Sequence, residues 1–186
     1  VNSDTRTGAG DAVRRLIADG HRRIGCIGIR ELSSRTAGYR DAMAEAGLTP
    51  EPGWIRETAL QAELGTTLSE AVSRDMVQLL TAGRLTAVFC ASDPLAMQLY
   101  QVAAALGIRI PEDLSIIGAA NTHYAQLATP PLSSVAQPFY EMGQQAVIAL
   151  EQKLTGAEVA PEIVLPTQLI LRRSHRSLRA LRSDEA

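Results

Sequence analysis

Apolar residues recur every three or four positions in five stretches of the chain, a spacing that predicts amphipathic helices. Each stretch stops at a glycine, as helices often do: Gly20, Gly47, Gly83, Gly107 and Gly156. Ser33 or Ser34 is expected to cap the second helix, and Asp93, followed by Pro94, to cap the fourth. The last helix is expected over 139–154.

Short apolar runs separate these helices and predict strands at 24–27, 54–55, 87–91 and 114–118, with a final extended stretch at 163–171. Pro166 marks that stretch as an edge strand or a bent one. Strands that read as continuous apolar runs are typical of parallel sheets, which are buried on both faces. The alternation of strand and helix therefore predicts an α/β fold, a parallel sheet with helices on both faces.

Open parallel sheets bind ligands at the carboxyl ends of their strands. The loops at that edge are expected at 28–35, 58–63, 92–94 and 118–123. Arg35 stands near a predicted helix start, where its charge opposes the helix dipole. It is expected either to bind an anionic or hydroxyl-rich ligand or to pair with a carboxylate such as Glu31. Asp93 is expected either to cap its helix or to contact the ligand.

Composition excludes several classes of protein. The longest apolar runs hold about five residues, whereas a membrane helix needs roughly 20, and no secretion signal opens the chain. Cys26 and Cys90 lie in apolar runs without CxxC spacing, so we expect buried thiols in a reducing compartment. Because the chain begins at Val1 rather than at methionine, its natural start is expected upstream.

Neither nucleic-acid binding by this chain alone nor catalysis is favoured. The net charge is −2 and the aromatic content 4%, and the five arginines of 172–182 are expected in a solvated terminus, with a nucleic-acid contact as the alternative. No GxSxG, HExxH or Walker pattern occurs, and 8–13 only loosely imitates a dinucleotide fingerprint. The histidines His21, His123 and His175 lie far apart, so no metal or cofactor site is expected and His21 is assigned a structural hydrogen bond.

Six short motifs follow one another along the chain: GHRRIG at 20–25, RTAGY at 35–39, TAVFCASD at 86–93, PEDLSIIG at 111–118, PPLSSVAQP at 130–138 and LRRS at 171–174. In this order and at this spacing they resemble the effector-binding core of the LacI/GalR family of bacterial transcription regulators. The resemblance covers residues 1 to about 174.

The resemblance implies a two-lobed fold like that of a periplasmic sugar-binding protein, with three chain crossings between the lobes. It implies that 1–20 and 136–158 are remnants of the first lobe and that 21–135 and 159–173 form the second lobe. A basic tail without fixed structure is expected at 174–186. The first-lobe helices would lack their sheet, so we expect them to pack on a partner, to pack on each other or to be poorly ordered.

The same resemblance implies the effector-sensing and dimerisation domain of a cytoplasmic transcription regulator. In the family, a small molecule in the interlobe cleft changes lobe closure and thereby operator affinity. The expected partners are that effector and a second copy of the chain, with no membrane. Operator DNA is expected to bind only through an N-terminal headpiece that this chain lacks. A periplasmic solute-binding protein of the same fold is the alternative.

The resemblance also implies the residues that line the effector site: Arg35, Ser92, Asp93, Asn121 and Gln137. Two positions depart from the family pattern, because Ala120 replaces a usual Asp and Leu60 replaces a frequent aromatic residue. Each loss weakens a hydroxyl-rich ligand by about 1–3 kcal/mol. The effector is therefore expected to be a sugar or another small metabolite, anionic or apolar ones included, and a pocket without function is the remaining alternative.

A dimer contact is implied for the helix at 94–106. Met97, Gln98 and Gln101 are the positions expected to point outward from this helix. The alternative for Met97 is internal packing, which is common for methionine.

Overall fold

Six strands form the main sheet in the part of the chain that the structure describes. The structure is a computed structural model, and it describes residues 1–58, 70–82 and 84–178. The strand order is β3-β2-β4-β5-β6-β8, and a separate pair joins β1 to β7. Their bounds are Asn2–Ser3 for β1, Ile24–Ile29 for β2, Ile55–Thr58 for β3, Ala87–Cys90 for β4, Ser115–Ala120 for β5, Ser133–Ala136 for β6, Val164–Leu165 for β7 and Gln168–Ile170 for β8.

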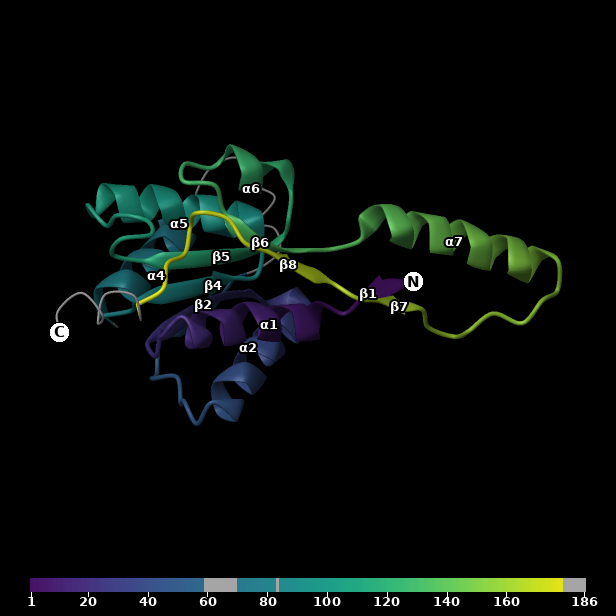
Figure 1. The fold of residues 1–186 in the computed structure, drawn as a ribbon, viewed down its shortest axis with the longest axis horizontal. Helices are drawn as coiled ribbons and strands as arrows, with labels where there is room; N and C mark the ends of the chain where they lie inside the picture. Colours follow the sequence, from purple (N-terminus) through teal and green to yellow (C-terminus); the bar gives the residue numbers. More distant parts are fainter. Residues whose placement is uncertain (59–69, 83, 179–186) are drawn as a thin grey trace.

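Helices cover both faces of this sheet (Figure 1). On one face lie α1 (Thr5–Ala18) and α2 (Ser33–Glu45), the latter preceded by the single turn η1 (Arg30–Leu32). On the other face lie α4 (Glu70–Ala82), α5 (Asp93–Ala105) and α6 (His123–Leu127). Strands β2 to β6 pair in parallel, and only β8 runs antiparallel, at the edge beside β6. The predicted α/β fold is confirmed. The final extended stretch is interrupted at Pro166, between β7 and β8, and β8 is an edge strand as expected.

Each face of the sheet has its own apolar core. Leu79, Leu95 and Ile116 lie in the cluster beneath α4 and α5, which also holds Cys90. Leu16, Tyr39, Met43 and Phe89 lie in the cluster beneath α1 and α2, which also holds Cys26. The two cysteines are therefore free, buried and on opposite sides of the sheet, as small apolar residues in a reduced protein would be.

Two predicted helix caps are wrong. Leu32 is the N-cap of α2 and makes no side-chain cap bond, because Ser33 already lies inside the helix. Ser92 is the N-cap of α5, and its hydroxyl accepts a hydrogen bond from the amide of Leu95 at 3.3 Å. Asp93 instead occupies the first turn of α5, where its carboxylate turns to other partners.

Helix α1 does not lack a sheet, contrary to our expectation for residues 1–20. Its apolar face, formed by Ala12, Val13 and Leu16, is buried against α2 and the main sheet. Tyr39 and Met43 of α2 belong to the same cluster, so α1 is part of the six-stranded unit. The lobe boundaries themselves stay a prediction.

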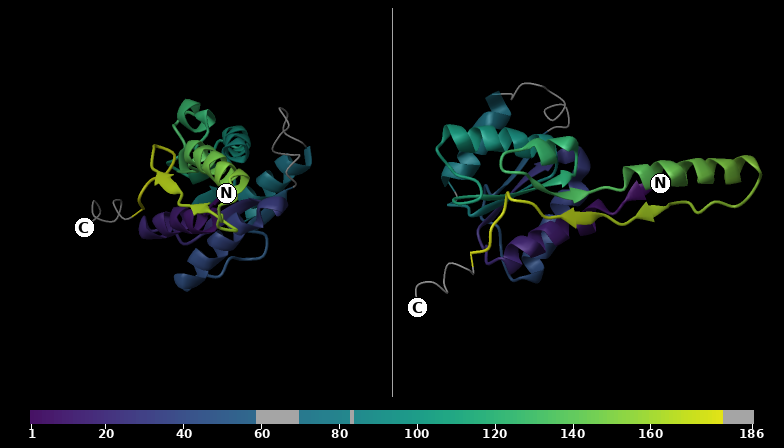
Figure 2. Two further views of the ribbon diagram at one scale, coloured as in Figure 1. Left: turned by 90° about the vertical axis from the view of Figure 1, so that its right-hand side faces the viewer. Right: turned by 45° about the horizontal axis from the view of Figure 1, so that its top comes forward.

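An arm projects from the main sheet and is built from β1, β7 and α7 (Phe139–Leu154) (Figures 1 and 2). No residue of α7 is buried. Its large exposed apolar side chains are Phe139, Tyr140, Val147, Ile148, Leu150 and Leu154. The expectation that the helices of the first lobe pack on each other is therefore not met by α7, and packing on a partner stays a prediction.

The start of the expected tail is ordered against the lobe, so the expectation of a tail without fixed structure is wrong for 174–178. Ser174 is fully buried and donates its hydroxyl to the carbonyl of Ile116 at 2.6 Å. Residues 179–186 lie outside the part of the chain that the structure describes. Within the described part, no helix has the length and apolar character needed to span a membrane.

Candidate functional site

The carboxyl edge of the sheet is where the chain passes between the main sheet and the arm. In the described chain this happens three times: from β1 into α1, from β6 into α7 and from β7 into β8 (Figure 1). Polar contacts join these crossings. The amide of Asp4 donates to the carbonyl of Leu165 at 2.8 Å, and the hydroxyl of Thr167 donates to the carbonyl of Asp4 at 3.1 Å.

Arg35 lies at this edge and is buried in spite of its charge, with 7% of its surface exposed. It occupies the first turn of α2, directly after β2 and η1. One guanidinium nitrogen, Nη1, donates to the carbonyl of Ala91 at the end of β4, and Nη2 donates to the side-chain oxygen of Gln137 at 2.9 Å. Gln137 follows β6, so the arginine ties together three strand ends. The alternative partner, Glu31, has a side chain that lies outside the described structure.

Gln137 extends this contact to the first crossing. Its Nε2 donates to the hydroxyl of Ser3 in β1 at 2.8 Å. A cavity of only about 10 Å³ remains beside the arginine. Its lining residues are Thr5, Ala9, Arg35, Phe89, Ala119, Val135 and Gln137. That volume is about the space one water needs, so this cavity is too small for a metabolite.

Asp93 is fully buried and acts as a tie between loops. Its Oδ1 accepts the hydroxyl of Ser134 at 2.6 Å, and its Oδ2 accepts the amide and the hydroxyl of Thr122 at 2.6 and 3.0 Å. Burial raises the pKa of this carboxyl group, while these hydrogen bonds lower it in part. Gly118 makes the approach feasible, since a Cβ there would lie 2.5 Å from the Asp93 carboxylate. Gly118 of β5 pairs with Ser134 of β6, so these contacts join both strands to the start of α5 and to the loop after β5.

Asn121 is displayed by an unusual turn after β5. Ala120 and Asn121 have φ values of 98° and 50°, a region that residues with side chains rarely adopt. The amide of Asn121 donates to the hydroxyl of Ser134 at 3.0 Å, and its Oδ1 accepts Nη2 of Arg172 at 2.7 Å. Consecutive positive φ values of this kind persist only where surrounding contacts hold them, and they cluster at functional sites.

Arg172 was missed as a site residue by sequence reasoning. It follows β8, and its Nη1 donates to the carbonyl of Leu132 at 2.7 Å while Nη2 holds Asn121. The LRRS motif was the available signal, but its arginines were assigned to a solvated terminus.

The remaining expected positions are one further effector-site residue and three residues of the dimer contact. Leu60 lies outside the described residues. Gln101 is exposed on α5 as expected, whereas Gln98 is buried and Met97 is half-buried against the core. Only one of the three expected outward positions is therefore outward within this chain, and the dimer contact itself stays a prediction.

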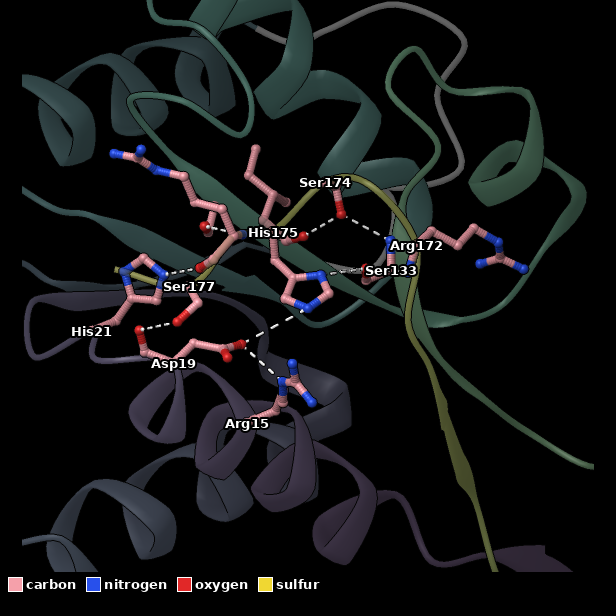
Figure 3. A network of polar contacts seen from close by, with 11 residues as sticks. Arg15, Asp19, His21, Ser133, Arg172, Ser174, His175 and Ser177 are labelled. Atoms are coloured by element: carbon pink, nitrogen blue, oxygen red, sulfur yellow. Dashed lines mark hydrogen bonds and ion pairs between the residues drawn. The ribbon is translucent and has the colours of Figure 1, made fainter. Parts of the chain in front are cut away.

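A second polar network lies at the opposite, amino end of the strands (Figure 3). His21 bonds the hydroxyl of Thr86 at 2.9 Å and the carbonyl of Arg176 at 3.0 Å, which confirms its structural role. His175 bonds the hydroxyl of Ser133 at 2.8 Å and lies 3.8 Å from the Asp19 carboxylate. Burial lowers the pKa of both histidines.

Among the described residues, no cluster of three or more His, Cys, Asp or Glu side chains could hold a metal ion. Burial raises the pKa of Cys26 to about 12 and that of Cys90 well above its ordinary value, so neither thiol is a nucleophile at neutral pH. The carboxyl edge holds the buried guanidinium of Arg35 together with the hydrogen-bonding side chains of Gln137, Asp93 and Asn121.

Comparison with known proteins identifies the fold. Residues 13–175 match the model of the family described as "Periplasmic binding protein-like domain". The chain belongs to this family.

Named relatives of the chain are transcription regulators. The chain is 39% identical over 184 residues to the HTH-type transcriptional repressor CytR of Escherichia coli (strain K12), covering 96% of this chain and 52% of the relative. It is 38% identical over 173 residues to the ribose operon repressor of Haemophilus influenzae (strain ATCC 51907 / DSM 11121 / KW20 / Rd), covering 90% and 50%. The chain thus spans about half the length of these curated relatives.

Solved structures agree. The structure of the transcriptional regulator CelR–cellobiose complex superposes with a TM-score of 0.82 at 32% identity, covering 92% of this chain and 52% of the other. The resemblance to the effector-binding core of LacI-type regulators is therefore confirmed. Because the named relatives are repressors, the comparisons also agree with the expectation that the chain is not an enzyme.

Proposed function

We propose that this chain is the part of a LacI-type transcription regulator that senses a small molecule and joins two copies. The effector binds between the main sheet and the other lobe, and lobe closure then changes operator affinity. The regulator works as a homodimer in the cytoplasm, where its operator lies. DNA is read by an N-terminal headpiece, which such regulators carry ahead of their two lobes.

One observation carries this proposal. A buried arginine at the carboxyl edge of the sheet is hydrogen-bonded through Gln137 to Ser3, so the best ligand-binding group of the lobe is connected to the chain crossings. A guanidinium presents several donors in a fixed fork, which suits hydroxyl, carboxylate or phosphate oxygens. When two lobes close around a ligand, the backbone angles change mainly at the hinge residues between the lobes.

Packing supports a lobe boundary slightly different from the expected one. Because α1 is buried against α2, we place the first crossing at Ser3–Asp4 instead of near residue 20. The arm of β1, β7 and α7 then belongs to the other lobe, whose sheet would cover the exposed apolar face of α7.

Dimerisation is assigned to the outer side of α5, where Gln101 is exposed. Tyr124 and Leu127 of α6 are also exposed and add apolar area on the same side of the sheet. Light scattering of the complete regulator at tens of micromolar should give a dimer, and a monomer there would remove this part of the proposal.

The test of function is ligand screening of the complete regulator. Its melting temperature should be measured with sugars, nucleosides and small organic acids, and hits confirmed by isothermal titration. A compound that binds should also change retardation of operator DNA, whereas Arg35→Ala should abolish its binding. Failure of all three compound classes to bind, or binding that survives Arg35→Ala, would contradict the proposal.

A further inference from the structure

The ligand-binding group of the proposed site is already occupied. Arg35 is almost fully buried, its guanidinium bonds the carbonyl of Ala91 and the amide oxygen of Gln137, and the adjoining cavity holds about 10 Å³. The Nη2 hydrogen that Gln137 now accepts becomes available to an effector oxygen only when the Gln137 amide is displaced. This cavity therefore admits an effector only if its walls rearrange, because it holds about one water.

Gln137 is also the only side chain that the described structure shows bonded to both Arg35 and Ser3. Its Oε1 accepts from the arginine at 2.9 Å, and its Nε2 donates to the Ser3 hydroxyl at 2.8 Å. Both atoms belong to one planar amide group, so a rotation that frees the oxygen also moves the nitrogen. Arg35 belongs to the main sheet unit, whereas Ser3 belongs to the arm.

Ser3 connects a rotation of the Gln137 amide to the chain crossing, because Ser3 lies at the crossing itself. It pairs with Leu165 in the β1–β7 ladder, and the next residue, Asp4, is bonded to Leu165 and Thr167 of the third crossing. Ser3 itself is 5% exposed. Loss of its bond to Gln137 leaves a buried hydroxyl with one partner fewer, which disfavours the present arrangement of the crossing.

We propose that Gln137 is a positioning residue that reports occupancy of the effector site to the lobe crossing: an effector displaces its amide from Arg35, and the same movement releases Ser3. This rests on the proposed function, and it assigns to Gln137 a role opposite to that of a simple ligand contact. A side chain that must leave before the effector enters opposes binding, because the protein has to give up two hydrogen bonds.

The first test needs no ligand. Arg35→Met removes the donor that holds Oε1 and so imitates its capture by an effector. Hydrogen exchange of the Asp4 amide, which is bonded to Leu165, should speed up several-fold in this variant. Gln137→Ala should speed it up similarly, and the double variant should show no more than the larger single effect. Arg35→Lys serves if Arg35→Met does not fold, since a lysine cannot bond Ala91 and Gln137 together in the same geometry.

Additive effects in this cycle, or an unchanged Asp4 exchange rate in the Arg35 variants, would overturn the proposal. Gln126→Ala, an exposed glutamine on α6, is the matched control and should leave Asp4 exchange unchanged.

The second test uses the complete regulator and any compound found in the screen of sugars, nucleosides and organic acids. Gln137→Ala should bind that compound several-fold more tightly, yet the compound's effect on operator affinity should fall by about tenfold. Weaker binding by Gln137→Ala would show a ligand contact and refute the positioning role. If no compound binds the wild type, the proposed function fails, while the exchange cycle still decides the role of Gln137.

Discussion

Gly38 of α2 faces the carbonyl oxygen of Arg6 in α1 so closely that a Cβ at position 38 would lie 2.0 Å from that oxygen. The amide nitrogen of Gly10 lies 3.1 Å from the same point. The two helices thus meet backbone to backbone, and only glycine permits this contact. It fixes α1 to α2 and with it the position of Arg35, one helical turn before Gly38.

Gly38→Ala should therefore destabilise the fold by about 1–3 kcal/mol, because backbone atoms must move apart to admit the methyl group. Urea denaturation followed by circular dichroism measures the change. Gly143→Ala is the matched control, since a Cβ there meets nothing within 4 Å. It should leave stability unchanged or raise it by up to about 1 kcal/mol, because alanine favours the helix more than glycine does. Equal losses in the two variants would contradict the close helix contact.

Arg172→Ala should cost about 1–3 kcal/mol, because it leaves the side-chain oxygen of Asn121 and the carbonyl of Leu132 without their donor. Its neighbour Arg173 has an exposed side chain, and Arg173→Ala should change stability by less than about 0.5 kcal/mol. Denaturant midpoints of the two variants give the comparison. If Arg172→Ala leaves the free energy of unfolding unchanged, the turn at Ala120–Asn121 does not depend on the bond from Arg172.

Stability should fall as the pH drops below about 6.5, the ordinary pKa of histidine in an unfolded chain. Desolvation is the main reason that the folded-state pKa values of His21 and His175 lie below 6.5. Between the folded and unfolded pKa values, the unfolded chain binds more protons than the folded chain. The free energy of unfolding therefore decreases in this window by up to about 1.4 kcal/mol per pH unit for each histidine.

Chemical denaturation from pH 7.5 to 5 measures this slope. His175→Gln should make it shallower, whereas His123→Gln, on the exposed surface of α6, should not. Hydrogen bonds lower the pKa values of the carboxyl groups of Asp4, Asp41 and Asp113. The contribution of these groups to the free energy of unfolding is therefore lost only in more acidic solution. A slope that is identical in the His175 and His123 variants would exclude His175 as its source.

Both thiols should resist a disulfide reagent such as DTNB until the protein unfolds, because burial keeps Cys26 and Cys90 protonated and out of reach. The labelling rate at pH 8 should follow the unfolded fraction as urea is added. Rapid labelling of either cysteine in native buffer would show that one face of the sheet opens without global unfolding.

Local sequence pattern predicts elements in which apolar residues recur at a regular spacing or form a continuous run. The strands at β2, β4 and β5 and the helix α7 were found with few boundary errors, because their apolar spacing alone specifies them. Strand β6 was not recognised, since two of its four residues are serines. Those hydroxyls are buried because distant groups satisfy them: Ser133 meets His175, and Ser134 meets Asp93.

The candidate site shows the same division. The position of Arg35 at the carboxyl edge follows from the strand–helix order, but its partner Gln137 lies 102 residues away. The expectation that Asp93 caps α5 failed because Ser134 and Thr122, 41 and 29 residues further on, attract its carboxylate. Local rules for caps describe isolated helices, and here tertiary hydrogen bonds override them.

The main sheet is complete only when residues near the C-terminal end of the chain have joined it. Strand β8 covers the edge of β6, and the segment that follows it bonds Ser115, Ser133 and the end of α1. During synthesis the chain leaves the ribosome from its N-terminus at about 5–20 residues per second. Strands β2 to β5 are therefore exposed for several seconds before the residues that seal β6 and the amino edge emerge, and a ribosome stalled before position 168 carries a lobe whose sheet is still open.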